Sequence, residues 1–164
     1  MSFRWLIGFQ VFRFPLELMM YRAMLEGLMP PQMSFDGFNF DIVTGLCAGA
    51  IALVGTWVEL PRWVYWAFNV LGATLLVVVV TIAIVSIPTF ALFGPDRVNT
   101  WVFGFPYVYL PAVMVQWALL GHLLVFRKLH LTSKLRAERG TQGGSDSNWS
   151  AIPERGKRSA SRAL

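Results

Sequence analysis

A charged pair inside the first apolar segment constrains this chain more than any other feature. Arg13 and Glu17 stand near the middle of residues 5–28, which are otherwise mostly apolar and include Pro15. At about 1.5 Å per residue, a helix of this length crosses the roughly 30 Å core of a bilayer. A charge at that depth costs about 2.5–3.5 kcal/mol on insertion scales. We therefore expect both side chains to turn inward, towards partners on other helices.

Composition places the whole chain in the membrane class. Of its 164 residues, 55% are hydrophobic, and the mean hydropathy is +0.54. Four apolar segments stand out, at residues 5–28, 42–57, 64–87 and 101–126. We predict an all-α membrane domain over residues 1–130 with four transmembrane helices.

The connection between the first two apolar segments carries a turn signal. Asp36 and Gly37 stand between two short runs of alternating polar and aromatic residues, a pattern typical of a two-residue β-hairpin. We predict a short external β-hairpin here. Asp41 is placed to cap the next helix, and this interpretation is favoured over a metal site because hard cations need more oxygen ligands.

Charge is distributed unevenly along the chain. Residues 1–126 carry five Lys or Arg against six acids, whereas residues 127–164 carry nine against three. Residues 131–164 are therefore predicted to form a basic, mostly disordered tail, with an anionic lipid surface as its partner rather than nucleic acid. Because Arg4, Arg62 and the tail fall on one side of the spans, both termini are expected to be cytoplasmic.

Polar residues on three of the predicted helices fall at similar depths in the membrane. Two interpretations remain open: a hydrogen-bonded latch in which Arg13 and Glu17 neutralise each other, or a ligand or proton site. Four further polar residues form a charged pair and a hairpin group near the outer interface, namely Arg22, Glu26, Asn39 and Asp41. The predicted intramembrane cluster consists of Gln10, Arg13, Glu17, Asn69, Gln116 and His122.

Established catalytic patterns give no support to an enzyme class. The sequence shows no catalytic triad, metal-ligand cluster or phosphate loop, and the two histidines lie on one predicted helix, which disfavours haem. No cofactor or metal is predicted. Aromatic residues near the outer interface suit an ordinary aromatic belt, with a lipid or quinone site as the alternative.

Several short motifs together resemble a group of small, uncharacterised bacterial four-span membrane proteins with no established activity. The motifs are residues 12–17 (FRFPLE), 26–30 (EGLMP), 39–42 (NFDI) and 105–111 (FPYVYLP). This resemblance covers about residues 8–130 and implies a multi-pass protein of the bacterial inner membrane.

The function predicted from these features is a non-enzymatic accessory or small-ligand- or lipid-binding membrane subunit. Such a subunit would work in the bilayer, with a membrane protein partner or a second copy of itself. The alternative is a membrane-embedded enzyme or proton-coupled carrier that uses a buried Arg, Glu and His cluster.

Overall fold

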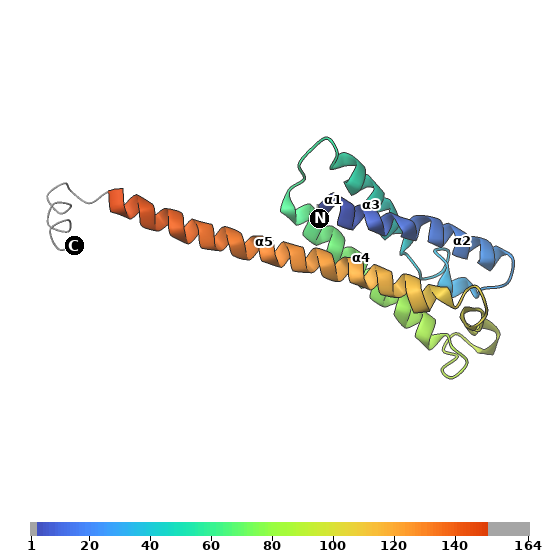
Figure 1. Ribbon diagram of the computed structural model, residues 1–164. Coiled ribbons are helices and arrows are strands. Elements are labelled where there is room, and N and C mark those ends of the chain that lie inside the picture. The colour runs from blue at the N-terminus through green and yellow to red at the C-terminus, as the bar shows by residue number, and fades with distance from the viewer. Residues whose placement is uncertain (1–2, 151–164) are drawn as a thin grey trace. The chain divides into compact units, whose positions relative to one another are not determined.

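A computed structural model describes the backbone of residues 3–150 and the side chains of residues 3–135. The chain divides into two compact units, with the boundary between Arg127 and Lys128. The α-helices are α1 (Phe3–Gly8), α2 (Arg13–Leu25), α3 (Ile42–Val54), α4 (Arg62–Val85) and α5 (Val115–Ser150), and the short 3₁₀ segment η1 (Phe9–Phe12) joins α1 to α2 (Figure 1).

The helix α3 packs along the first helical stretch of the chain. It contacts α1, η1 and α2 in turn, and also α4, and Figure 1 shows it beside α1 and α2. Gly45 permits this approach, because a Cβ atom added to it would lie 2.5 Å from the backbone nitrogen of Phe14. Small residues allow helix backbones to come this close.

The prediction of four transmembrane helices is wrong. Among the described residues, two helices are long and apolar enough to cross a membrane, Arg62–Val85 and Leu110–Leu135. The first predicted span is divided into α1, η1 and α2, since Pro15 cannot donate a hydrogen bond to the preceding turn and helical geometry tightens there. The second, α3, has 13 residues, about 20 Å of helix, and is too short for the bilayer core.

The predicted external β-hairpin is also wrong, because the described residues contain no strand. Instead, Pro31–Met33 forms the 3₁₀ turn η2, and the Ser34 carbonyl accepts hydrogen bonds from the backbone N–H groups of Gly37 and Asn39. Ser34 and Asn39 are buried while Phe38 is exposed. The side chains of Ser34 and Asn39 thus face inward. The hydrogen bonds to the Ser34 carbonyl turn the loop back on itself, where the alternating pattern predicts two paired strands.

Irregular backbone connects α4 to α5. The chain passes through the 3₁₀ turns η3 (Pro95–Arg97) and η4 (Trp101–Phe103), and then through one turn of π-helix, η5 (Leu110–Met114), which leads directly into α5. Prolines at positions 106 and 111 lack backbone donors, which accounts for the loss of regular helix in this part of the chain.

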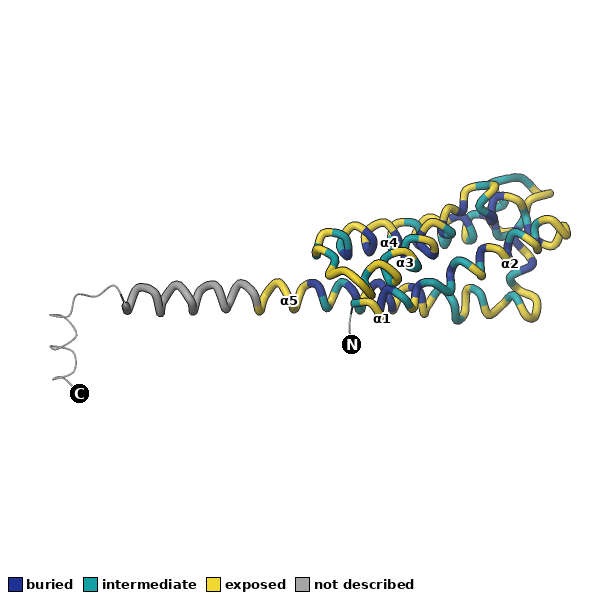
Figure 2. Tube along the Cα trace, turned by 90° about the horizontal axis from the view of Figure 1, so that it is seen from above, coloured by how far each residue is buried: buried dark blue, intermediate teal, exposed yellow. Residues whose placement is uncertain are grey.

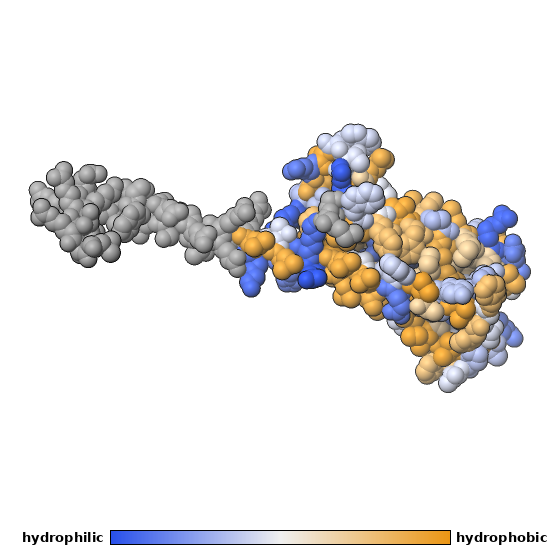
Figure 3. Space-filling view, viewed as in Figure 1, coloured by the Kyte–Doolittle hydropathy of each residue, from blue (hydrophilic) through white to orange (hydrophobic). Residues whose placement is uncertain are grey.

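Apolar side chains cover much of the outside of the first unit. On α4, Val70, Val77 and Ile84 are 51%, 64% and 50% exposed. Among the residues whose burial is described, buried positions recur along one side of each helix (Figure 2), and hydrophobic residues cover much of the face shown in Figure 3. Such a surface is unusual for a monomer in water and suits contact with lipid.

The predicted basic tail begins inside α5, which continues as helix to Ser150. Residues 151–164 lie outside the described residues, so the disorder predicted for the tail stays a prediction.

The contact of α3 with α2 gives a test of this packing. Gly45→Ala should destabilise the protein by about 1–3 kcal/mol, because the added methyl group meets the Phe14 backbone. Gly49→Ala on the same helix is the control, since a Cβ there would lie 4.0 Å from the side chain of Val11, an ordinary van der Waals distance. Thermal unfolding in detergent measures both variants. Equal stability of the two would contradict the packing.

Candidate functional site

Arg13 lies at the centre of a buried polar network in the first unit. Its side chain is 2% exposed, and its Nε atom makes a salt bridge of 2.8 Å to Oδ2 of Asp41. Its Nη1 atom lies 3.0 Å from Nε2 of His122. Through Arg13, the start of α2 is connected both to the start of α3 and to α5.

The partners of His122 fix its tautomer. A guanidinium only donates, so Nε2 of His122 must accept from Arg13 and the ring proton must lie on Nδ1. Nδ1 then donates to Oδ1 of Asn69 at 2.9 Å, and Nδ2 of Asn69 donates to the His122 carbonyl at 3.1 Å. Both ring nitrogens are therefore occupied, and α4 is joined to α5 by two hydrogen bonds.

Glu17 is held by Asn39 from the loop that precedes α3. Nδ2 of Asn39 donates to both carboxylate oxygens of Glu17, at 2.9 and 3.0 Å, and to the carbonyl of Met33. Oδ1 of Asn39 accepts from the backbone N–H of Asp41. This one amide therefore fixes both Glu17 and the position of Asp41.

Asp41 occupies the N-cap position of α3, but its carboxylate pairs with Arg13 instead of capping the helix. Burial raises the pKa of Asp41, while the charge of Arg13 opposes that shift. Among the interactions that favour the ionised carboxylate, the charge of Arg13 is the largest.

The remaining residues singled out from the sequence differ in their surroundings. Gln10 is buried, and its Nε2 donates to the carbonyl of Ala118 at 3.1 Å. Gln116, Arg22 and Glu26 are exposed. The structure therefore brings Gln10, Arg13, Glu17, Asn69 and His122 together and adds Asn39 and Asp41. Gln116 lies outside this network and lines the neighbouring cavity.

Glycines allow the helices to close around this network. A Cβ atom on Gly72 would lie 2.5 Å from Cε1 of His122 and 2.8 Å from Cγ2 of Thr44. A Cβ atom on Gly121 would meet the amide of Gln10. The network is thus packed on both the α4 and the α5 sides, and larger residues at these positions would force it apart.

A cavity of about 370 Å³ opens beside the network, within the first unit. Its size is in the range of small-molecule sites, about 300–1,000 Å³. Most of its wall is apolar and comes from α2, α4 and the segment from η4 to the start of α5. Among the described residues, its charged lining consists of Arg13, Glu17 and Asp41.

Three polar atoms on residues that line the cavity have no hydrogen-bond partner in the described part of the chain. They are Nη2 of Arg13, Nε1 of Trp101 and Oδ1 of Asn99, and all three are buried. A buried polar atom left unpaired costs about 1–3 kcal/mol. Two donors and one acceptor are therefore left unpaired, within the described chain, on residues that line the cavity.

Sequence reasoning missed the part that Asn39 and Asp41 play. A signal was present, because Arg13 precedes Glu17 at i,i+4, the weaker order for a helical ion pair, and this order indicates partners outside the pair. The positions of those partners depend on how the loop before α3 folds back over α2, which no local pattern encodes.

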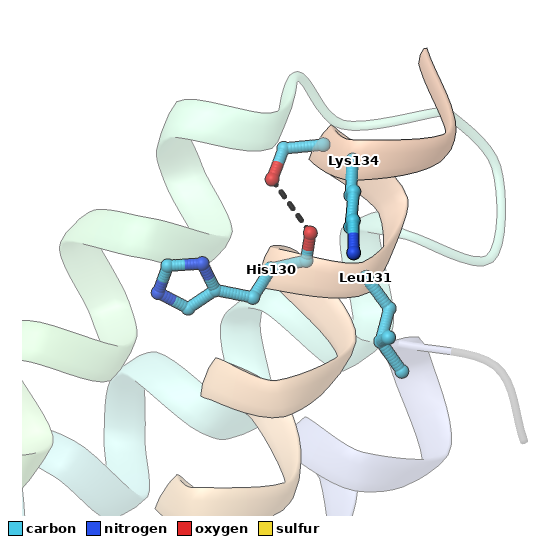
Figure 4. Close-up of a pocket in the computed structure, with 4 residues that line it drawn as sticks. His130, Leu131 and Lys134 are labelled. Carbon is cyan, nitrogen blue, oxygen red and sulfur yellow. Dashed lines mark hydrogen bonds between the residues drawn. The ribbon is translucent and has the colours of Figure 1, made fainter. Parts of the chain in front are cut away.

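A second, shallow hollow lies on α5 in the other unit. It is lined by His130, Leu131, Ser133 and Lys134, and the Ser133 hydroxyl donates to the His130 carbonyl at 2.7 Å (Figure 4). The ring of His130 points away from Leu131 and Lys134. Because these side chains do not converge, this hollow is not a candidate site.

Comparison with protein-family models, curated proteins and solved structures gives no match for this chain. The resemblance to a bacterial four-span group is thus a prediction from the sequence alone, and the site must be interpreted from its own geometry.

The Arg13–Asp41 salt bridge predicts a large effect for a small substitution. Asp41→Asn should cost about 3–5 kcal/mol, because it leaves the Arg13 cation buried without its counter-ion. The matched control is Asp36→Asn in the same loop, where the side chain is exposed and the change should cost little. Chemical unfolding in mild detergent gives both values. A similar loss for the two variants would contradict the assigned salt bridge.

Proposed function

We propose that this protein is a multi-pass protein of the bacterial inner membrane that binds a lipid-like small molecule without transforming it. The observation that carries the proposal is the cavity of about 370 Å³, which joins an apolar wall to a buried charged end at Arg13, Glu17 and Asp41. Ligand sites commonly combine an apolar lining with a few placed polar groups.

The outer surface supports the membrane part of this proposal. The two apolar helices Arg62–Val85 and Leu110–Leu135 have the length of a bilayer span. Exposed tryptophans at positions 5, 57 and 63 lie in the same parts of the chain as Arg4 and Arg62. Tryptophan and arginine at one end of a span are typical of the membrane–water interface.

The distribution of basic residues favours a cytoplasmic α3–α4 connection, which carries Arg62 and the exposed Glu59. On this orientation, a cysteine at Glu59 in a Cys47→Ser background should resist an impermeant thiol reagent applied to whole cells, and a cysteine at the exposed Asp96 should react. The opposite pattern of labelling would overturn the orientation.

Binding is favoured over acid–base chemistry by the state of the polar side chains. His122 has both ring nitrogens engaged, and both oxygens of Glu17 accept from Asn39. A general acid or base needs an atom that can reach a substrate proton. The same engagement weighs against a proton carrier built on these residues.

A retained ligand is the outcome that tests the proposal. The full chain, purified from bacterial membranes in mild detergent, should carry a small molecule near one equivalent after lipid extraction and mass spectrometry. Ala83→Phe should reduce this amount strongly, because Ala83 lines the cavity. Ala67→Phe makes the same change at an exposed position of α4 and should not reduce it.

Two results would contradict binding in this cavity. One is wild-type protein that retains no stoichiometric molecule. The other is equal retention by the folded Ala83→Phe and Ala67→Phe variants, which would put the molecule elsewhere on the surface.

A further inference from the structure

The polar end of the cavity also constrains the chemistry of what it holds. This step rests on the proposed function and concerns the class of ligand. Arg13 lines the cavity and uses Nε for Asp41 and Nη1 for His122, while its buried Nη2 has no partner in the described part of the chain. Since a guanidinium nitrogen can only donate, the molecule opposite must offer an acceptor atom.

The charge balance of the cavity excludes one common kind of acceptor. In the described chain its charged lining residues are Arg13, Glu17 and Asp41, and Asp41 already neutralises Arg13 through a salt bridge of 2.8 Å. A phosphate or carboxylate headgroup would therefore bring a further negative charge next to two acids, where the cation of the described lining is already paired. A buried charge without a counter-ion of its own is costly.

A cationic headgroup is disfavoured for a different reason. An ammonium group carries no acceptor for Nη2 of Arg13 and would lie close to that cation. A donor that needs an acceptor, on a cation that already has its counter-ion, fits an uncharged oxygen.

A second pair of polar atoms that the described chain leaves unpaired lies on residues 99 and 101, which also line the cavity. Nε1 of Trp101 is a donor and Oδ1 of Asn99 is an acceptor, and both are buried without a partner in the described part of the chain. Asn99 is held in place because its Nδ2 donates to the carbonyl of Ala83. A carbonyl would satisfy Trp101 alone, whereas a hydroxyl could satisfy either atom.

We infer that the cavity takes an uncharged lipid whose polar end carries carbonyl or hydroxyl oxygen, with one such oxygen facing Nη2 of Arg13. Two kinds of uncharged lipid share this chemistry, an acylglycerol and an alkyl quinone. An acylglycerol has both ester carbonyls and a hydroxyl, while a quinone has carbonyls only.

A set of three short-chain probes tests the inference on the full-length protein in detergent, depleted of retained lipid. Native mass spectrometry titrations would use dioctanoylglycerol, an alkyl benzoquinone with a ten-carbon chain, and dioctanoyl phosphatidate. The first and third differ only by the phosphate. We expect at least one uncharged probe to bind at one equivalent and at least tenfold more tightly than phosphatidate.

A matched pair of variants tests where the probe sits. Trp101→Phe removes the indole N–H in the cavity wall and should weaken binding of the preferred probe roughly three- to tenfold, the value of one hydrogen bond. Trp117→Phe is the control, because Trp117 is exposed and lies outside the cavity lining. It should bind as the wild type does.

Whichever of the two uncharged probes binds more tightly identifies the subclass of lipid. Of the two, only dioctanoylglycerol carries a hydroxyl that can donate to Asn99. Phosphatidate that binds as well as the uncharged probes would overturn the inference while leaving the proposed function intact. Failure of all three probes would overturn it too, and the retention experiment then decides whether the proposed function fails with it. Equal effects of Trp101→Phe and Trp117→Phe would likewise contradict this site.

Discussion

The salt bridge between Arg13 and Asp41 is the interaction on which the rest of the first unit depends. Arg13 carries a charge that cannot stay buried alone, and Asp41 supplies the counter-ion from a loop 28 residues further along the chain. To bring the two together, the loop after α2 must turn back and α3 must lie along α2. The path of the chain from α2 to α3 is therefore set by the need to neutralise one buried cation.

The same cation organises the contacts to the remaining helices. Nη1 of Arg13 reaches His122 on α5, and His122 exchanges hydrogen bonds with Asn69 on α4. Hydrogen bonds are directional, so this network fixes the depth at which each helix stands, whereas apolar contacts alone would let the helices slide. The glycines at positions 72 and 121 give the network the space it occupies.

The hydrogen bonding of Arg13 is incomplete, and this has a functional consequence. Arg13 lines the apolar cavity, and one of its nitrogens has no partner in the described part of the chain, although the other two are engaged. If the network served only to fix the helices, an apolar side chain filling this space would be more stable. The combination of a cavity and an unused donor is the reason to prefer a binding role over a purely structural one.

The sequence predicted an all-helical fold with long apolar helices, and the burial of the central polar residues, better than it predicted the number of those helices. Burial of Gln10, Arg13, Glu17, Asn69 and His122 follows from the cost of leaving polar groups on the outer face of an apolar helix. Span counting failed because apolar length does not reveal where Pro15 interrupts a helix or that α3 ends after 13 residues. The hairpin failed because Asn39 bonds to Glu17 on α2, a long-range contact that the local alternation of residues does not contain.

A double-mutant cycle on Arg13 and Asp41 tests the central role of this salt bridge most directly. The stability of the wild type, Arg13→Met, Asp41→Leu and the combined variant is measured by unfolding in detergent, beside a second cycle on Arg13→Met and Glu17→Leu. We expect a coupling energy of about 2–3 kcal/mol for Arg13 with Asp41 and a smaller one for Arg13 with Glu17, which Asn39 holds. A coupling near zero for Arg13 with Asp41, or a larger one for Arg13 with Glu17, would contradict the account.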